Sequence, residues 1–334
     1  MHRRLALLST LTIAAGSLLL PTAPALAEAE PKPAQQVAAD SAGERQAVLD
    51  HWTARRMETA PPLDVPASSD GIRLTAGATG AAPWGAPATT ASSAVSGTAS
   101  TAVLVPNSGG APWTGGGAVT RTTGRVFFTT QGRDASCSGS AVTSANKSVV
   151  LTAGHCVKLG GAFHTNWVFV PGYDAGTRPF GTWVATRLLT TPQWNSSEDI
   201  NYDVAAAVVA PLAGASLTDV VGGQGVAFNQ ARRQQMYAFG YPAAAPYDGS
   251  RLIYCSGRAF DDFLLSRDLG LTCNMTGGSS GGPWMLNFTE STGLGTLNSV
   301  NSFKYNFAAN WMFGPYFGPE AQAVYQAAQT AAAL

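Results

Sequence analysis

Charged side chains are scarce in this chain of 334 residues, and neither sign dominates. Only 12% of the residues are charged, and 20 Lys and Arg balance 20 Asp and Glu, so the formal net charge is zero. Proteins that bind nucleic acid or anionic membranes through bulk charge carry an excess of basic residues, which this chain lacks. We therefore expect no nucleic-acid partner and no membrane partner of that kind.

Long hydrophobic runs are also scarce. The apolar stretch at 5–20 follows two arginines, Arg3 and Arg4, and is interrupted by Ser and Thr, so it is a poor membrane span. The small-residue sequence Ala-Leu-Ala at 25–27 comes shortly after it. These features are typical of a secretory signal peptide over 1–27, cleaved after Ala27. We expect a secreted, extracellular protein.

Cysteine and histidine occur only four times each. The cysteines are Cys137, Cys156, Cys255 and Cys273, and four cysteines allow three disulfide pairings that spacing alone does not separate. In an exported protein an even number favours two disulfides over a zinc site, and we expect no metal and no cofactor. Pairing of neighbours along the chain closes two loops of about 20 residues, each worth about 3 kcal/mol.

The stretch from 28 to 115 differs in composition from the rest. It holds one helix-like segment near 47–60, ended by Pro61 and Pro62, and then a tract rich in Ala, Gly, Ser, Thr and Pro. Such a tract has too few large apolar side chains to build a core, and we expect it to be flexible. The sequence predicts a pro-segment and linker over 28–115, with a permanent disordered stalk as the alternative.

Short strands dominate the remaining domain, which we place at 116–334. About ten to twelve apolar runs alternate with Gly, Asn, Asp and Ser turns, and this pattern predicts an all-β sandwich or barrel. A helix-like stretch follows at 319–334. The expected strands lie at 125–130, 137–142, 148–152, 167–170, 182–186, 204–209, 235–239, 252–255, 284–286 and 297–300.

A serine among glycines is the first candidate for chemistry. The stretch 277–283 reads Gly-Gly-Ser-Ser-Gly-Gly-Pro, and glycines permit conformations that leave backbone N–H groups free to face a ligand. It also fits the G-x-S-x-G pattern of α/β-hydrolases, in which the histidine follows the serine. No histidine follows Ser280, so that assignment fails. By itself the stretch is more typical of an ordinary turn, because Gly-rich turns are common in this sequence.

Two further candidates stand at the ends of apolar runs. His155 follows the strand-like run at 149–151 and precedes Cys156, which can tether it. Asp203 begins an apolar run, where a buried carboxylate needs a partner such as an imidazole N–H. The plain alternatives are a turn histidine and a solvated aspartate at a strand end. Together with Ser280 these residues occur in the order His, Asp, Ser.

With these motifs in that order, the chain resembles the trypsin/chymotrypsin-like serine peptidases, and within them the secreted bacterial branch that includes glutamyl endopeptidases. Thr-Ala-Gly-His-Cys at 152–156, Asp-Val at 203–204 and the serine stretch carry the resemblance, which runs from about 137 to 303. It implies an all-β fold of two six-stranded antiparallel β-barrels, to which the chain adds its C-terminal helix. It also implies a disulfide from Cys137 to Cys156.

The resemblance further implies a serine endopeptidase that acts on polypeptide substrates, and we expect a monomer. In this family the serine attacks the peptide carbonyl and forms an acyl-enzyme, the histidine transfers the proton and the aspartate orients the histidine. Those roles fall on Ser280, His155 and Asp203. The backbone N–H groups of Gly278 and Ser280 are the expected oxyanion hole.

The substrate-binding positions depart from trypsin. Asn274 stands where trypsin has an acid, so preference for Arg or Lys loses its simplest basis. Lys304 favours an acidic substrate side chain, but Asn301 replaces the histidine of glutamyl endopeptidases, so acidic and neutral specificity both stay open. Ser302 resembles the serine that supports the catalytic aspartate and lines the substrate strand.

Activation also departs from trypsin, because Ser279 replaces the aspartate that pairs with a new N-terminus. The sequence therefore predicts a zymogen whose pro-segment acts by occlusion or by assisting folding. Pro-segments of the bacterial branch can carry a W-T-x-x-R-M-like stretch, found here at 52–57.

Two other functions remain alternatives: a catalytically silent binding or adhesion module, and an esterase that uses the same triad. A zinc hydrolase is disfavoured because the chain has no H-E-x-x-H motif.

Overall fold

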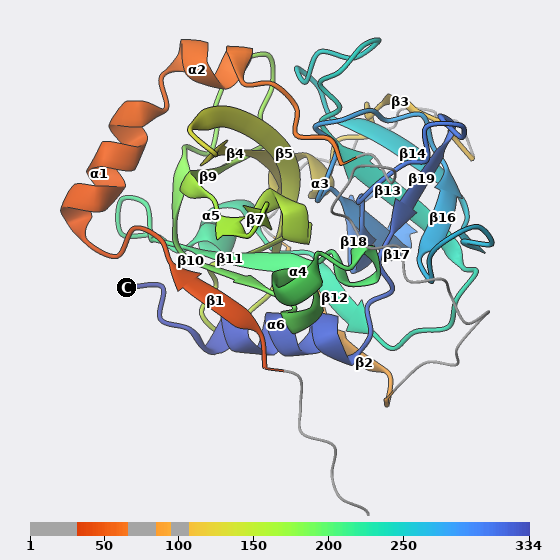
Figure 1. Ribbon diagram of the computed structural model, residues 1–334. Helices are drawn as coiled ribbons and strands as arrows, with labels where there is room; N and C mark the ends of the chain where they lie inside the picture. The colour runs from red at the N-terminus through yellow and green to blue at the C-terminus, as the bar shows by residue number, and fades with distance from the viewer. Residues whose placement is uncertain (1–31, 66–84, 95–106) are drawn as a thin grey trace, which may run out of the picture.

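The computed structural model describes residues 32–65, 85–94 and 107–334. The expected signal peptide lies outside the described residues. The molecule is mostly β, with two halves placed side by side and short helices around them, as in a chymotrypsin-like double barrel (Figure 1). All ten stretches expected to be strands are strands.

The first half is a closed antiparallel barrel of six strands. The ring closes because β10 pairs with β11 along most of its length and with β9 at its beginning, where Trp183 faces Phe169. Large apolar side chains fill its interior and are almost fully buried. The strands are β4 (Thr123–Thr130), β5 (Arg133–Val142), β6 (Val149–Thr152), β9 (Thr165–Pro171), β10 (Trp183–Thr190) and β11 (Ala205–Val209).

The second half combines a seven-stranded sheet with a three-stranded one, rather than a single six-stranded ring. One pairing, β12 with β18, is parallel. The large sheet has the order β2 (Ala88–Thr90), β12 (Gly225–Phe228), β18 (Leu294–Val300), β17 (Pro283–Thr289), β13 (Gln235–Gly240), β14 (Ile253–Arg258) and β3 (Ala111–Pro112). The small sheet has the order β15 (Phe260–Asp261), β16 (Leu269–Thr272) and β19 (Trp311–Gly314).

Parts of the stretch expected to be pro-segment and linker are ordered against these sheets. The strands β2 and β3 occupy the two edges of the large sheet, and β1 (Ala34–Val37) pairs with β10 of the barrel. An added strand at a sheet edge satisfies N–H and C=O groups that would otherwise be unpaired. The boundary between linker and peptidase domain at 115 stays a prediction.

The expected helix near 47–60 is two helices, α1 (Ala42–His51) and α2 (Ala54–Thr59). The break occurs because Thr53 takes an extended conformation and its hydroxyl accepts the N–H of Arg56, which caps a new helix. Ser41 and Glu44 form a capping box that starts α1. Both helices lie on the outer surface of the first barrel (Figure 1).

The C-terminal helix is present as α6 (Pro319–Thr330) and packs on the first barrel and β12. No helix among the described residues is long and apolar enough to cross a membrane. The remaining elements are a small hairpin and short helical turns: β7 (Lys158–Leu159), β8 (Ala162–Phe163), α3 (Val119–Thr122), η1 (Gly154–Cys156), α4 (Pro192–Ser197), η2 (Ile200–Tyr202) and α5 (Leu217–Val221).

Candidate active site

The predicted site residues meet where the two halves face each other. His155 lies in η1, directly after β6, and Asp203 follows η2, so both belong to the first half. Ser280 lies in the loop before β17, and Ser302 lies two residues after the end of β18, so both belong to the second half. The candidate site is therefore assembled only when both halves have folded.

His155 and Asp203 are in direct contact and fully buried. The Nδ1 atom of His155 lies 2.7 Å from Oδ2 of Asp203, and the backbone N–H of His155 donates to Oδ1 at 2.8 Å. The hydroxyl of Ser302 also donates to Oδ2. A buried carboxylate that accepts several hydrogen bonds is stabilised in its charged form. This arrangement fixes the plane of the imidazole and places Nε2 on the far side from Asp203.

The Nε2 atom of His155 is buried and has no hydrogen-bond partner among the described residues. Such orphaned atoms are rare in protein interiors and need an explanation. The loop that carries Ser280 packs nearby: a side chain at Gly281 would meet Oγ1 of Thr152 and the backbone N of Ala153, just before His155. The serine loop therefore rests against the residues that lead into His155.

Ser138, which the sequence analysis did not single out, joins the two walls of the site. Its N–H donates to the carbonyl of Ser280 at 2.7 Å, and its hydroxyl donates to the carbonyl of Gly278 at 2.9 Å. The same hydroxyl accepts the N–H of Tyr241 at 2.9 Å. The only signal in the sequence is its place beside Cys137. Ser138 fixes the serine loop against the barrel strand that leads to the disulfide.

The two backbone N–H groups on either side of Ser279 are free. Ser279, Gly281 and Gly282 donate their N–H groups to protein carbonyls, whereas no acceptor for the N–H of Gly278 or Ser280 occurs among the described residues. Gly278 has φ of +93°, and a Cβ there would lie 2.9 Å from the carbonyl oxygen of Tyr241. Only glycine takes this conformation without strain. Two N–H groups are thus left available for an anionic oxygen.

Two disulfides hold the elements around the site. Cys137 is bonded to Cys156, which ties the strand before Ser138 to the residue after His155. Cys255 is bonded to Cys273, which links β14 to the end of β16. This is the pairing of neighbours along the chain, and it confirms the bridge from Cys137 to Cys156 that the resemblance implied.

The bridge also excludes a metal at this point. The Sγ atoms of Cys137 and Cys156 lie within metal-binding distance of a ring nitrogen of His155, and this is the one such group among the described residues. Both sulfurs are bonded to each other, so neither offers a thiolate ligand.

A second histidine supports the first. Nε2 of His164 lies 2.8 Å from the carbonyl oxygen of His155, and its ring stacks on Phe128 with centroids 4.4 Å apart. Burial lowers the pKa of His164 to about 4, although the bond to His155 acts in the opposite direction. A neutral imidazole here donates to the carbonyl and holds the turn without adding charge beside the site.

The expected substrate-binding residues lie on two loops. Lys304 is half-buried, and its ammonium donates to the carbonyl of Met275 at 2.8 Å. Burial lowers the pKa of Lys304 to about 8, and Asp64 acts in the opposite direction. Asn274 is exposed, and its side-chain oxygen accepts the hydroxyl of Tyr247 at 2.6 Å.

Solved structures that match this chain include two proteases. The protease Anisep from Arthrobacter nicotinovorans is 46% identical, with a TM-score of 0.61, over 63% of this chain and 96% of that one. The thermostable serine protease AL20 from an extremophilic microorganism is 45% identical, with a TM-score of 0.61, over 64% of this chain and 99% of that one. This chain belongs to the chymotrypsin-like serine protease family.

The relation to glutamyl endopeptidases is more distant. A Glu endopeptidase solved in complex with MPD matches 68% of this serine protease chain and 99% of its own, at 16% identity and a TM-score of 0.51, which shows the shared fold alone. No protein-family model and no curated protein matches the chain. The identity to two solved serine proteases establishes a serine-type endopeptidase.

Proposed function

We propose that this serine protease is secreted with a removable pro-segment and cleaves polypeptides through Ser280, His155 and Asp203. The observation that carries the proposal is the state of His155: one ring nitrogen is bonded to a buried carboxylate, while the other is buried and unpaired beside the serine loop. A general base requires this combination, since one nitrogen is oriented and the other is left to take a proton.

In the proposed reaction the Oγ atom of Ser280 attacks the carbonyl carbon of the peptide bond and transfers its proton to Nε2 of His155. The C–N bond then breaks, the protonated imidazole returns that proton to the leaving amine, and an acyl ester remains on Ser280. Water attacks this ester with His155 again as base, releasing the acid and restoring the serine. Asp203 stabilises the imidazolium throughout.

The developing oxyanion would be bound by the N–H groups of Gly278 and Ser280. Both are free of protein acceptors among the described residues, and Gly278 has a positive φ that glycine adopts without strain. A single donor of this kind contributes about 3 kcal/mol to transition-state stabilisation in enzymes of this class. Asn274, Ser302 and Lys304 stay the proposed contacts to the substrate.

Secretion, a pro-segment and a monomeric state complete the proposal. The N-terminal sequence supports export, and the two disulfides are typical of proteins in oxidising compartments. The two solved serine proteases span about two thirds of this chain, which is the length expected after removal of an N-terminal segment.

The proposal is tested by labelling the secreted, processed protein with a fluorophosphonate, which reacts with activated serines. We expect label on the wild type, placed on Ser280 rather than Ser279 by peptide mapping, and none on Ser280→Ala. A His155→Ala variant should also lose the label, because the hydroxyl is then no longer activated.

Label that persists in Ser280→Ala would contradict the assignment of the nucleophile. Folded, processed wild type that takes no label would favour the silent binding module. Comparison of a peptide amide with its matched ester then separates peptidase from esterase.

A further inference from the structure

The chain that follows α2 crosses the candidate active site. In Figure 1 it leaves α2 and runs between the two halves of the molecule. We call residues 61–65 the strap. Its first contact is with Ser136, directly before Cys137: the N–H of Ser136 donates to the carbonyl of Pro61 at 2.8 Å, and the N–H of Leu63 donates to the carbonyl of Ser136 at 2.9 Å. The strap thus adds a short parallel pairing to β5.

The strap then reaches the second half. Asp64 lies against the serine loop, because a Cβ added to Gly277 would be 3.0 Å from the Cβ of Asp64. Val65 is buried in an apolar cluster with Trp194 and Phe303, whose neighbours in the chain include Ser302. The ring of Trp194 lies 6.3 Å from the ring of His155. Three consecutive strap residues therefore make three different contacts. Leu63 contacts β5, Asp64 contacts the serine loop, and Val65 contacts the apolar cluster around Trp194 and Phe303.

Both proposed catalytic side chains are buried when the strap is in place. Ser280 is 5% exposed and His155 is 0% exposed, although a polypeptide substrate must reach both. A peptidase must hold its substrate with the scissile carbonyl beside the nucleophile. The strap contacts the residue before Cys137, the serine loop at Gly277 and the cluster that contains Phe303, and a substrate bound at Ser280 would have to lie among these same segments.

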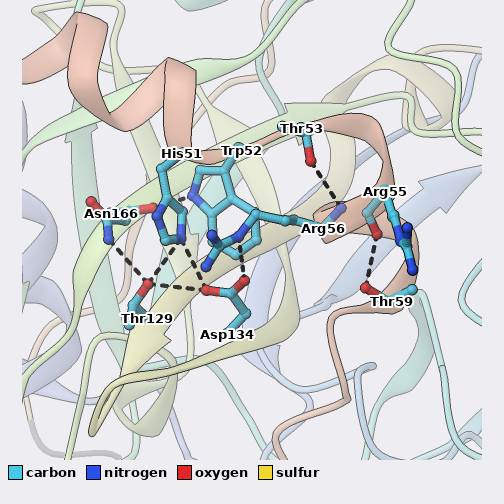
Figure 2. A network of polar contacts seen from close by, with 9 residues as sticks. All are labelled: His51, Trp52, Thr53, Arg55, Arg56, Thr59, Thr129, Asp134 and Asn166. Atoms are coloured by element: carbon cyan, nitrogen blue, oxygen red, sulfur yellow. Dashed lines mark hydrogen bonds and ion pairs between the residues drawn. The ribbon is translucent and has the colours of Figure 1, made fainter.

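A second set of contacts fixes the segment before the strap. We call the residues that make these contacts, His51, Trp52, Arg56 and Met57, the anchor. Figure 2 shows that His51 and Arg56 converge on Asp134 of β5, whereas Arg55 points away. Nε2 of His51 lies 2.9 Å from one carboxylate oxygen, and Nε of Arg56 donates to the other at 2.7 Å. Trp52 is 1% exposed and donates its ring N–H to the carbonyl of Asn166.

The anchor is built as an interface rather than as a surface contact. Trp52 packs on Phe127 of the barrel with ring centroids 5.5 Å apart, and Met57 is buried on the same face. Burial raises the pKa of Asp134, and the bonds from Arg56 and His51 more than offset this, so its pKa lies below the usual value. An aromatic side chain in a pocket beside a satisfied charged group is the composition of an interface hot spot.

We infer that the anchor and the strap form a built-in inhibitor, so that residues 32–65 keep the enzyme latent after folding and still inhibit it once cut from the chain. The inference rests on the proposed catalytic role of Ser280. The anchor supplies the affinity, and the strap blocks the cleft.

The test begins with the full chain, purified as the uncut precursor and carrying an added recognition site for a specific protease within 67–83. Fluorophosphonate labelling of Ser280 should be at least 100-fold slower in the uncut precursor than in the cut and diluted protein. In the cut protein the rate should rise on dilution, because the fragment dissociates by mass action. In the uncut chain it should not depend on concentration.

A synthetic peptide of residues 32–65 should then restore inhibition of the cut enzyme. We expect Trp52→Ala in the peptide to weaken inhibition by at least 100-fold and Arg56→Ala by a few-fold, as for a large buried side chain and a half-exposed ion pair. Arg55→Ala is the matched control and should inhibit like the wild type. Changes in the peptide leave the folding of the enzyme unaffected.

Equal labelling of uncut and cut protein, or a peptide without effect, would overturn the inhibitor. A folded, cut and diluted protein that takes no label would instead overturn the catalytic role of Ser280, and the inhibitor with it. The two failures are therefore distinguishable.

Discussion

Ser138 is a small side chain between the serine loop and the barrel strand. Its hydroxyl donates to the carbonyl of Gly278 and accepts the N–H of Tyr241, so it sets the orientation of the peptide plane beside a proposed oxyanion donor. A buried hydroxyl with both functions used is costly to remove, since its partners are left unpaired.

We expect Ser138→Ala to lower kcat about tenfold with little change in KM, because the oxyanion is bound only in the transition state. Steady-state kinetics on a peptide substrate measure both constants. Ser140→Ala, two residues along the same strand, removes a hydroxyl that donates only to the Ala141 carbonyl at 3.4 Å and serves as the control. A rise in KM at constant kcat would show that Ser138 supports substrate binding instead.

Asp268 is the second residue with a measurable consequence. It is fully buried, and neither carboxyl oxygen has a hydrogen-bond partner among the described residues. Burial, and then the neighbouring Asp262 and Asp203, raise the pKa of Asp268 well above its usual value. Above the ordinary pKa of an aspartate, the unfolded chain therefore releases the proton of the Asp268 carboxyl group, whereas the folded protein still holds it.

This difference makes stability fall as pH rises, because the folded state binds more protons than the unfolded state between the two pKa values. We predict that Asp268→Asn flattens the decrease in melting temperature between pH 4.5 and 7.5, measured by scanning calorimetry. An unchanged slope in the variant would show that Asp268 is ionised in the folded protein.

At the scale of elements, the two disulfides close loops of similar length but lie in different surroundings. Their sequence separations are 19 and 18 residues. The chain-entropy account gives each about 3 kcal/mol of stability. Only the Cys137–Cys156 bridge joins segments that carry His155 and Ser138.

We predict that double alanine variants of either bridge lose about 3 kcal/mol in the free energy of unfolding, measured by urea denaturation. Loss of Cys137–Cys156 should also lower kcat at temperatures where the protein stays folded, whereas loss of Cys255–Cys273 should leave kcat within twofold. Equal kcat in both variants would show that the first bridge has no part in positioning.

The elements also show where sequence reasoning succeeds. β6 is apolar from Val149 to Leu151 and buried along its whole length, so its pattern predicts a strand without tertiary information. The break between α1 and α2 was missed, because it depends on a Thr cap that periodicity does not register. The edge strands β2 and β3 come from a tract with few large side chains, and their order depends on the sheet edges they pair with and, for β3, on the buried Trp113 that follows it.

The candidate site also has residues that the sequence predicts and residues that it does not. Chain order and short motifs bring forward His155, Asp203 and Ser280, because each motif combines a reactive group with the glycines or cysteine that hold it. Ser138 and the strap have no such signal. Their roles arise from contacts between residues more than 70 positions apart, such as Leu63 with Ser136 and Ser138 with Gly278.

At the scale of the whole molecule, β2 protects an edge of the second half. It pairs with β12 through three residues, and Ser93 exchanges backbone hydrogen bonds with Gly223. We predict that a protein beginning at residue 107 melts below one beginning at residue 85, by roughly 2–4 °C for each kcal/mol of pairing lost. Both lack the strap, so their rates of fluorophosphonate labelling at 20 °C should agree. Equal melting temperatures would show that β2 adds no stability.

The strap contacts both halves at once: Leu63 bonds to β5, and Val65 packs beside Phe303, which follows β18. It can seat only on a molecule in which both halves are complete and correctly placed. The proposed catalytic groups come together under the same condition. Under the proposed inhibition, closure of the cleft needs nothing beyond the assembly of the site, and the protease would open only after the segment is cut.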